Sequence, residues 1–256
     1  MAELFDMRAR ALRRDRAAQR PELFLHERAF ADCLDRLDLV GRRFERALLI
    51  GCPDEEWPRR LGKYSKEVEV RDPGPRFAAK AHGSVLIEDA WVPAEQAFDL
   101  VLALGTLDSV NELPVALRLV RHGMRRDALF LGAFPGGENL PRLRSAMRAA
   151  DAVTGFAAPH VHPRIEASAV APLLVEAGFV QPVIDVDRVP VSYASLGSLV
   201  GDLRAMAATN ILSARPRFMG RLSWQAAQSA FTSTAQNQRT IETFEIIHFA
   251  AWTQTG

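Results

Sequence analysis

The sequence predicts an α/β protein with a doubly wound, mostly parallel sheet of seven strands. Three observations support this fold class. Short apolar runs alternate with helix-like segments from Arg46 onward, two helices precede the first run, and two more strands stand near the C-terminus. Buried parallel strands are near-continuous apolar runs, and helices cover both faces of such a sheet. The two late strands predict an antiparallel C-terminal edge.

Composition narrows the function classes. The 256 residues are 48% apolar, enough for a packed core in one large domain or in one domain with a small appendage. The 32 basic and 31 acidic residues leave a net charge of +1, so the chain lacks the global field that attracts nucleic acid. No apolar stretch reaches the length of a membrane span, and the two cysteines form no disulfide framework. We therefore expect a cytoplasmic protein with no nucleic-acid partner.

Two N-terminal helices are predicted, at Leu4–Gln19 and Leu23–Val40. The first is rich in arginine, but acidic side chains are interleaved with the basic ones. A solvated helix face is the preferred interpretation, over a basic arm or an organelle presequence. The charged residues concerned are Glu3, Asp6, Arg8, Arg10, Arg13, Arg14, Asp15, Arg16 and Arg20.

The remaining elements follow from apolar runs and periodicity. Strands are expected at Ala47–Ile50, Glu67–Val70, Ser84–Ile87, Phe98–Leu104, Ala128–Ala133, Val180–Val186 and Thr243–Trp252. Helices are expected at Leu113–His122, Glu138–Ala150, Ala167–Ala177 and Ser195–Thr209. The segment from Pro216 to Arg239 is ambiguous, and Pro190–Ser195 resembles a short spacer.

The strand ends carry the candidate ligand residues, because ligands of doubly wound sheets sit at the carboxyl ends of the first strands. Gly51 and Cys52 follow the first strand, but the other glycines of a G-x-G-x-x-G loop are missing, and Pro-Asp-Glu-Glu stands there instead. Asp72 follows the second strand, about where a ribose-binding carboxylate belongs. Glu88 and Asp89 follow the third strand, and the fourth is followed by LGTLDSVNELP.

Several segments together resemble one family, the class I S-adenosylmethionine (SAM)-dependent methyltransferases. Within it they are similar to the group of the mitochondrial complex I assembly-factor methyltransferase-like proteins and their bacterial relatives. Nearly the whole chain takes part in the resemblance. The segments are FDMRARALRRDRAA (Phe5–Ala18), FDLVLALGTLDSVNELPVAL (Phe98–Leu117), LFLGAFPGGENLPRLRSAM (Leu129–Met147), VAPLLVEAGFVQPVIDVDRVPVSYAS (Val170–Ser195), DLRAMAATN (Asp202–Asn210) and TFEIIHFAAW.

The resemblance implies a Rossmann-like fold in one domain, residues 1–256. It comprises a helical cover at 1–45, a core at 46–190, a helical lid insertion at 191–240 and a final strand at 241–256. It also implies a SAM pocket, in which the protein mainly positions an already activated methyl group. The implied cofactor-binding residues are Gly51, Cys52, Asp72, Pro73, Glu88, Asp89, Ala90, Leu104 and Gly105.

The chain departs from the family pattern in two places. Pro53 lacks an N–H, and side chains replace glycines in the first loop. After the fourth strand, relatives usually carry a His-Trp pair where this chain has Asp108 and Ser109. Asp108 and Asn111 are the candidate catalytic residues, since they follow the strand where the transferred group would meet its acceptor.

Structural interpretations remain open beside these assignments. The acids after Pro53 would cap the next helix without any ligand, Asp72 could simply open a turn, and Asp108 could simply begin a helix. His160 and His162 would project to the same side of an extended segment, but no third metal ligand stands at a convincing spacing. We therefore expect no metal site.

Three functions follow as expectations. The first is a SAM-dependent methyltransferase for a small-molecule or protein acceptor. The second follows the resemblance: an assembly factor that acts on a subunit of respiratory complex I, as an arginine hydroxylase. The third is a non-catalytic interaction module that kept the fold and lost the cofactor.

Overall fold

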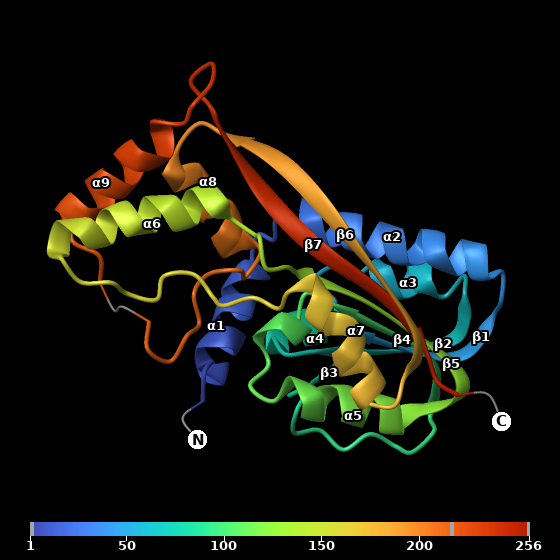
Figure 1. The fold of residues 1–256 in the computed structure, drawn as a ribbon. Helices are drawn as coiled ribbons and strands as arrows, with labels where there is room; N and C mark the ends of the chain where they lie inside the picture. Colours follow the sequence, from blue (N-terminus) through green and yellow to red (C-terminus); the bar gives the residue numbers. More distant parts are fainter. Residues whose placement is uncertain (1–2, 216–217, 255–256) are drawn as a thin grey trace.

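The protein forms a seven-stranded sheet in the order β3-β2-β1-β4-β5-β7-β6 (Figure 1). The computed structural model describes residues 3–215 and 218–254. Strand β7 runs antiparallel to both of its neighbours, and the other pairs are parallel. The strands are β1 (Phe44–Ile50), β2 (Ser65–Asp72), β3 (Ser84–Val85), β4 (Phe98–Leu104), β5 (Met124–Pro135), β6 (Val180–Tyr193) and β7 (Thr240–Trp252). The predicted fold class is confirmed.

Helices cover both faces of this sheet, and the two apolar cores lie between helices and strands. On one face α2 and α3 pack against the central strands, where Phe30 and Trp57 are fully buried. On the other face lie α5 and α7, whose Val120 and Leu174 meet strand residues such as Phe130. The helices are α1 (Met7–Ala17), α2 (Phe24–Val40), α3 (Trp57–Leu61), α4 (Pro75–Lys80), η1 (Leu107–Ser109), α5 (Leu113–Gly123), α6 (Pro141–Thr154), α7 (Ala167–Glu176), α8 (Leu196–Ala205) and α9 (Arg221–Thr232).

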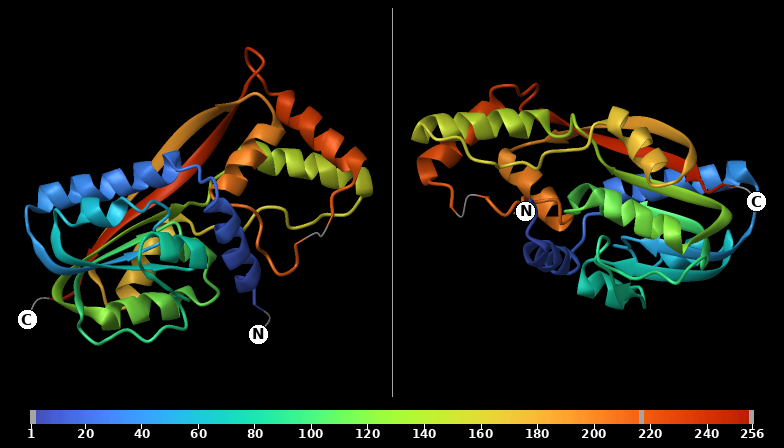
Figure 2. Two further views of the ribbon diagram at one scale, coloured as in Figure 1. Left: turned by 180° about the vertical axis from the view of Figure 1, so that it is seen from behind. Right: turned by 60° about the horizontal axis from the view of Figure 1, so that its bottom comes forward.

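Strands β6 and β7 continue past the sheet as a two-stranded ribbon. β7 pairs with β5 only from Ile246 onward, whereas β6 follows it from Thr240 (Figure 1). Helices α6, α8 and α9 gather beside this ribbon around their own apolar cluster, which includes Leu199 and Phe231. We call these three helices the cap. Figure 2 shows the cap to one side of the sheet, with α1 next to it.

The structure differs from the sequence prediction mainly at element ends. β6 reaches Tyr193, so most of the expected spacer Pro190–Ser195 is strand, and Ser195 caps α8 through its side chain. The segment from Pro216 to Arg239, which was ambiguous in sequence, contains α9. Its first two residues, Pro216 and Arg217, lie outside the described residues. β3 has only two residues. No helix of the described residues is long and apolar enough to cross a membrane.

Candidate functional site

Gly51 follows the last residue of β1 in a backbone conformation that a side chain would not tolerate. Its φ is +82°, and an added Cβ would overlap the backbone carbonyl of Leu104 at the end of β4. The close approach of two strands therefore explains this glycine without any ligand. Leu104 and Gly105, two of the implied cofactor-binding residues, lie where β4 ends, at the same end of the sheet.

The loop after Gly51 is anchored to the protein core. Asp54 accepts a hydrogen bond from the backbone N–H of Glu56 at 2.9 Å, just before α3. Trp57 begins α3 and stacks on Phe30 with a ring-centroid distance of 4.3 Å, while its indole N–H donates to Glu27. Burial raises the pKa of the Cys52 thiol, so this group stays protonated. These contacts match the interpretation of the loop as a fold-preserving turn.

Asp72, at the end of β2, is completely buried and holds a dense set of hydrogen bonds. Arg14 binds it through both Nε, at 2.8 Å, and Nη2, at 2.6 Å. The backbone N–H groups of Cys52 and Gly74 donate to the same carboxylate at 2.8 and 2.6 Å. Pro73, next in the chain, is also buried. The candidate ribose ligand is thus occupied by a guanidinium group of the protein itself.

Glu88, in the segment after β3, has the same kind of partner. Arg10 binds its two carboxylate oxygens at 2.7 Å each, and it also donates to the backbone carbonyl of Thr106. Both side chains are almost fully buried. Asp89 accepts instead from the backbone N–H of Glu112 at 3.0 Å, and Ala90 is exposed.

The two arginines lie one turn apart on α1, so they project from the same face of that helix. Arg10 and Arg14 are 4% and 5% exposed, and the interpretation of α1 as a solvated helix face is wrong for these two residues. A signal was present in the sequence. The arginines stand four residues apart, and Ala9 and Ala17 beside them are small enough for close packing.

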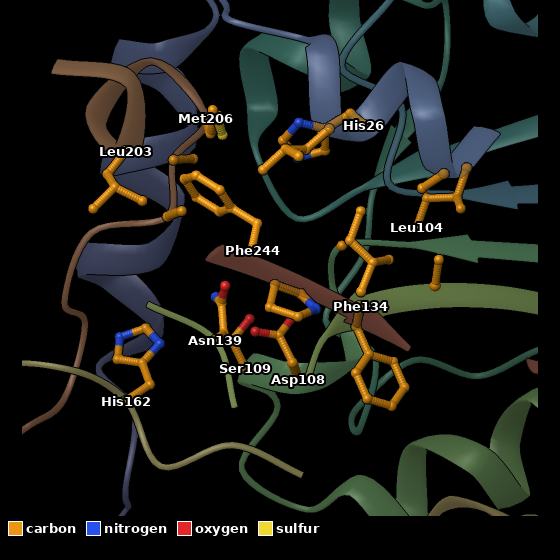
Figure 3. A pocket seen from close by; sticks show the side chains of 18 of the residues that line it. His26, Leu104, Asp108, Ser109, Phe134, Asn139, His162, Leu203, Met206 and Phe244 are labelled. Carbon is orange, nitrogen blue, oxygen red and sulfur yellow. The ribbon is translucent and has the colours of Figure 1, made fainter. Parts of the chain in front are cut away.

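A cavity of about 100 Å³ opens beside the arginines, between the sheet and the cap (Figure 3). Arg10 and Arg14 line it, while the carboxylates that they bind are buried behind them. Asp108, Ser109 and Asn139 are among the polar side chains that line the cavity and are labelled in Figure 3. The other labelled residues that line it are His26, Leu104, Phe134, His162, Leu203, Met206 and Phe244.

The two candidate catalytic residues lie in different places. Asp108 faces the cavity and forms a buried ion pair with Arg164, a residue that sequence reasoning did not single out. Asn111 binds the N-terminal segment instead. Its Oδ1 accepts from the backbone N–H of Phe5 at 2.8 Å, and its Nδ2 donates to the carbonyl of Phe5 at 3.1 Å. Asn111 therefore holds the chain just ahead of α1.

The two histidines of the cavity are kept neutral by their surroundings. Burial, together with the charge of Arg14, lowers the pKa of His26 to about 4. Burial and the nearby guanidinium groups of Arg164, Arg13 and Arg144 lower the pKa of His162 to about 3. Nε2 of His162 accepts the backbone N–H of Ile211 at 2.8 Å, which requires a deprotonated nitrogen. Within the described residues, no group of three or more His, Cys, Asp or Glu side chains could hold a metal ion.

Acid is expected to destabilise the protein through His162. The unfolded chain binds a proton near pH 6.5, whereas the folded chain resists it until about pH 3, so stability falls as the pH drops between these values. A His162→Gln variant should lose about 2 kcal/mol less than the parent between pH 7 and pH 5. Urea unfolding across this range measures the difference. Exposed His122→Gln is the control, and parallel pH profiles for parent and H162Q would contradict the expectation.

Comparison with known proteins gives relatives over most of the chain. No family model matches it. The chain is 28% identical over 240 residues to the mitochondrial arginine-hydroxylase NDUFAF5 of Danio rerio, covering 90% of this chain and 75% of that protein. It is 27% identical over 245 residues to a malonyl-[acyl-carrier protein] O-methyltransferase of Xylella fastidiosa, covering 87% and 79%. The same enzyme of Laribacter hongkongensis is 31% identical over 179 residues, covering 69% and 59%.

Two solved structures have a fold similar to that of this chain. The YcgJ protein of Bacillus subtilis matches with a TM-score of 0.61 at 12% identity, over 90% of this chain and all of that one. A putative methyltransferase of Bacillus halodurans matches with a TM-score of 0.58 at 10% identity, over 87% and 99%. The chain is thus related to NDUFAF5 and to the malonyl-[acyl-carrier protein] O-methyltransferases, and it has the Rossmann-like fold of the class I SAM-dependent methyltransferases. The resemblance found in the sequence motifs is confirmed, including the relation to NDUFAF5.

The structure brings most of the predicted site residues into two groups. Gly51, Cys52, Asp72 and Pro73 surround the ends of β1 and β2, and the α1 arginines join Glu88 to them. Leu104, Gly105 and Asp108 line the cavity beyond those arginines. The remaining assigned residues, Asp89, Ala90 and Asn111, contact other parts of the chain or solvent.

Proposed function

We propose that this protein is a SAM-dependent methyltransferase whose acceptor binds in the cavity between the sheet and the cap. The observation that carries the proposal is an arrangement of side chains at the carboxyl ends of the parallel strands. Buried carboxylates follow β2 and β3, and a largely apolar cavity with a few polar groups adjoins them at the ends of β4 and β5. Doubly wound sheets bind nucleosides and their reaction partners at the carboxyl ends of their strands.

The donor and acceptor groups suit a nucleoside once α1 is withdrawn. Asp72 would accept hydrogen bonds from the ribose hydroxyls, beside the backbone of Gly51, Cys52 and Pro73. Glu88, with Asp89 and Ala90, would lie on the adenine side. With α1 in place, both buried carboxylates already bind guanidinium groups, so the residues do not fit SAM in that arrangement. Bound SAM would supply an activated methyl group, and the protein's own part is to position the acceptor and exclude water.

The cavity supports an acceptor with an apolar body and a polar reacting group. Leu203, Met206 and Phe244 offer apolar contacts, and Asp108 and Asn139 offer hydrogen bonds (Figure 3). The ion pair with Arg164 holds the carboxylate of Asp108 in one orientation. Under this proposal Asp108 orients the acceptor, and Leu104 and Gly105 form the floor between acceptor and cofactor.

Calorimetric titration with S-adenosylhomocysteine tests the proposed function. We expect saturable binding by the parent protein and loss of binding in Asp72→Asn, because the amide replaces one acceptor oxygen by a donor. Exposed Asp185→Asn is the matched control and should bind as the parent does. Methyl transfer from labelled SAM to candidate acceptors then identifies the substrate. Absence of binding to both SAM and S-adenosylhomocysteine, in the parent and in a variant without the guanidinium groups of Arg10 and Arg14, would reject the methyltransferase proposal.

A second candidate is a SAM-independent assembly role on a subunit of respiratory complex I. Two observations favour it: the glycines of the first loop are replaced, and both nucleoside carboxylates carry internal partners. Relatives named arginine-hydroxylase NDUFAF5 give this candidate its reaction class. Deletion of the gene should then lower the NADH oxidation activity of complex I in membranes. Unchanged activity would count against it.

A further inference from the structure

Helix α1 has an unusual buried face. Its four buried residues are Ala9, Arg10, Arg14 and Ala17, so large apolar side chains are absent from that face. Burial of apolar area normally supplies most of the stability of a docked helix, at about 25 cal/mol per Å². Since two alanines provide little such area, α1 is held mainly by the two arginines.

Those arginines bind the two carboxylates that the proposed function assigns to SAM. A bidentate guanidinium–carboxylate pair fixes both partners in one plane and uses both carboxylate oxygens. Arg14 forms such a pair with Asp72, and Arg10 forms one with Glu88. A ribose and its base would need the same oxygens and the same space. Seating of α1 and binding of a nucleoside are therefore mutually exclusive.

Other contacts of α1 lie along the helix and at both of its ends. Along the helix, Arg13 donates to Thr209 and Asp15 accepts from the backbone N–H of Arg76 at 2.9 Å. Phe5 is held through its backbone by Asn111, and Asp6 caps the helix and pairs with Arg215. At the far end, Lys80 donates to the carbonyl of Ala18 at 2.6 Å. Helices held by few apolar contacts belong to the parts of a protein that open at low free-energy cost. These end contacts leave α1 tethered to the protein when its central arginines are displaced.

We propose that α1 is an internal competitor of the nucleoside: Arg10 and Arg14 close the SAM site, and SAM binds only when α1 withdraws. This inference rests on the proposed function, and it adds that the position of α1 regulates SAM binding. The apparent affinity for SAM is reduced by the fraction of molecules in which α1 is withdrawn. Any partner that draws α1 away raises SAM affinity without touching the pocket.

Gly74 provides a variant that displaces α1 and keeps every charged group. An added Cβ would stand 2.6 Å from Cβ of Arg14, too close for the helix to remain where it is. Its φ of −97° tolerates alanine. We expect Gly74→Ala to bind S-adenosylhomocysteine about tenfold more tightly than the parent. The matched control is Gly201→Ala in α8, where an added Cβ meets no other atom.

A double variant tests the arginines directly. Arg10→Gln with Arg14→Gln removes both guanidinium groups and keeps a polar side chain at each position. It should bind S-adenosylhomocysteine at least about tenfold more tightly than the parent, and the exposed Arg16→Gln on the same helix should bind as the parent does. Thermal melting of each variant confirms that it is folded before titration.

Amide hydrogen exchange gives a readout that is independent of affinity. Addition of S-adenosylhomocysteine to the parent should speed exchange in Met7–Ala17, because ligand binding withdraws the helix. Equal affinities of the parent, G74A and the double variant, with unchanged exchange in α1, would overturn the inference and leave the methyltransferase proposal standing. Absence of ligand binding in all of these proteins would overturn the proposed function, and with it the competition.

Discussion

Replacing Asp72 by alanine is expected to lower the free energy of unfolding by about 3–5 kcal/mol. The substitution leaves the guanidinium group of Arg14 buried without its countercharge, and it deprives the N–H groups of Cys52 and Gly74 of their acceptor. Both effects are costly because Asp72 is fully buried. The melting temperature should fall by roughly 10 °C, which differential scanning calorimetry measures.

A surface carboxylate provides the comparison for Asp72. Asp185 on β6 pairs with Arg36, but its side chain is 57% exposed. Pairs of this kind contribute about 0–1 kcal/mol, so Asp185→Ala should melt close to the parent protein. Similar losses for D72A and D185A would show that burial of the Arg14–Asp72 pair has little effect on stability.

Gly51→Ala should be the second large change, with a loss of about 3 kcal/mol in the free energy of unfolding. Part of the loss comes from the left-handed φ of +82°, and part comes from the overlap of the new Cβ with the carbonyl of Leu104. Relief of that overlap requires β1 and β4 to separate at their ends. Urea denaturation measures the loss.

Gly41 allows the two contributions to be separated. It ends α2 at a φ of +64°, and an added Cβ there meets no atom within 4 Å. Gly41→Ala should therefore cost only about 1 kcal/mol, the conformational part alone. Equal losses in G41A and G51A would mean that the contact with Leu104 adds nothing, and the fold-based explanation of Gly51 would be wrong.

The fold was largely predictable because the sheet is buried. Runs such as Phe98–Leu104 are apolar at almost every position, which a fully covered parallel strand requires, and the structure places β4 over the same residues. The ends of elements were less predictable. β6 continues through Pro190 because the long ribbon pairs with β7 outside the sheet, and α9 is stabilised by packing on α6 rather than by a strong local pattern.

The candidate site was predictable only in part, for a physical reason. Strand-end residues such as Asp72 and Asp108 are placed by the topology of the sheet, which the apolar pattern reveals. Arg10 and Arg14 reach the site from a helix that precedes the sheet, and an arginine looks the same in sequence whether it faces water or a buried carboxylate. Only the three-dimensional packing of α1 distinguishes the two environments.

The contacts of α1 have a consequence for the order in which the chain folds. Arg14 pairs with a residue 58 positions later, and Arg10 with one 78 positions later. Asp6 pairs with Arg215, 209 positions along the chain. α1 is synthesised before the sheet, but its anchor between Asp6 and Arg215 can form only after Arg215 has been made. Contacts between residues so far apart in sequence form late in folding. The ion pairs of Arg10 and Arg14 can therefore form once the first half of the chain has been made, whereas the anchor of Asp6 has to wait for the segment that follows α8.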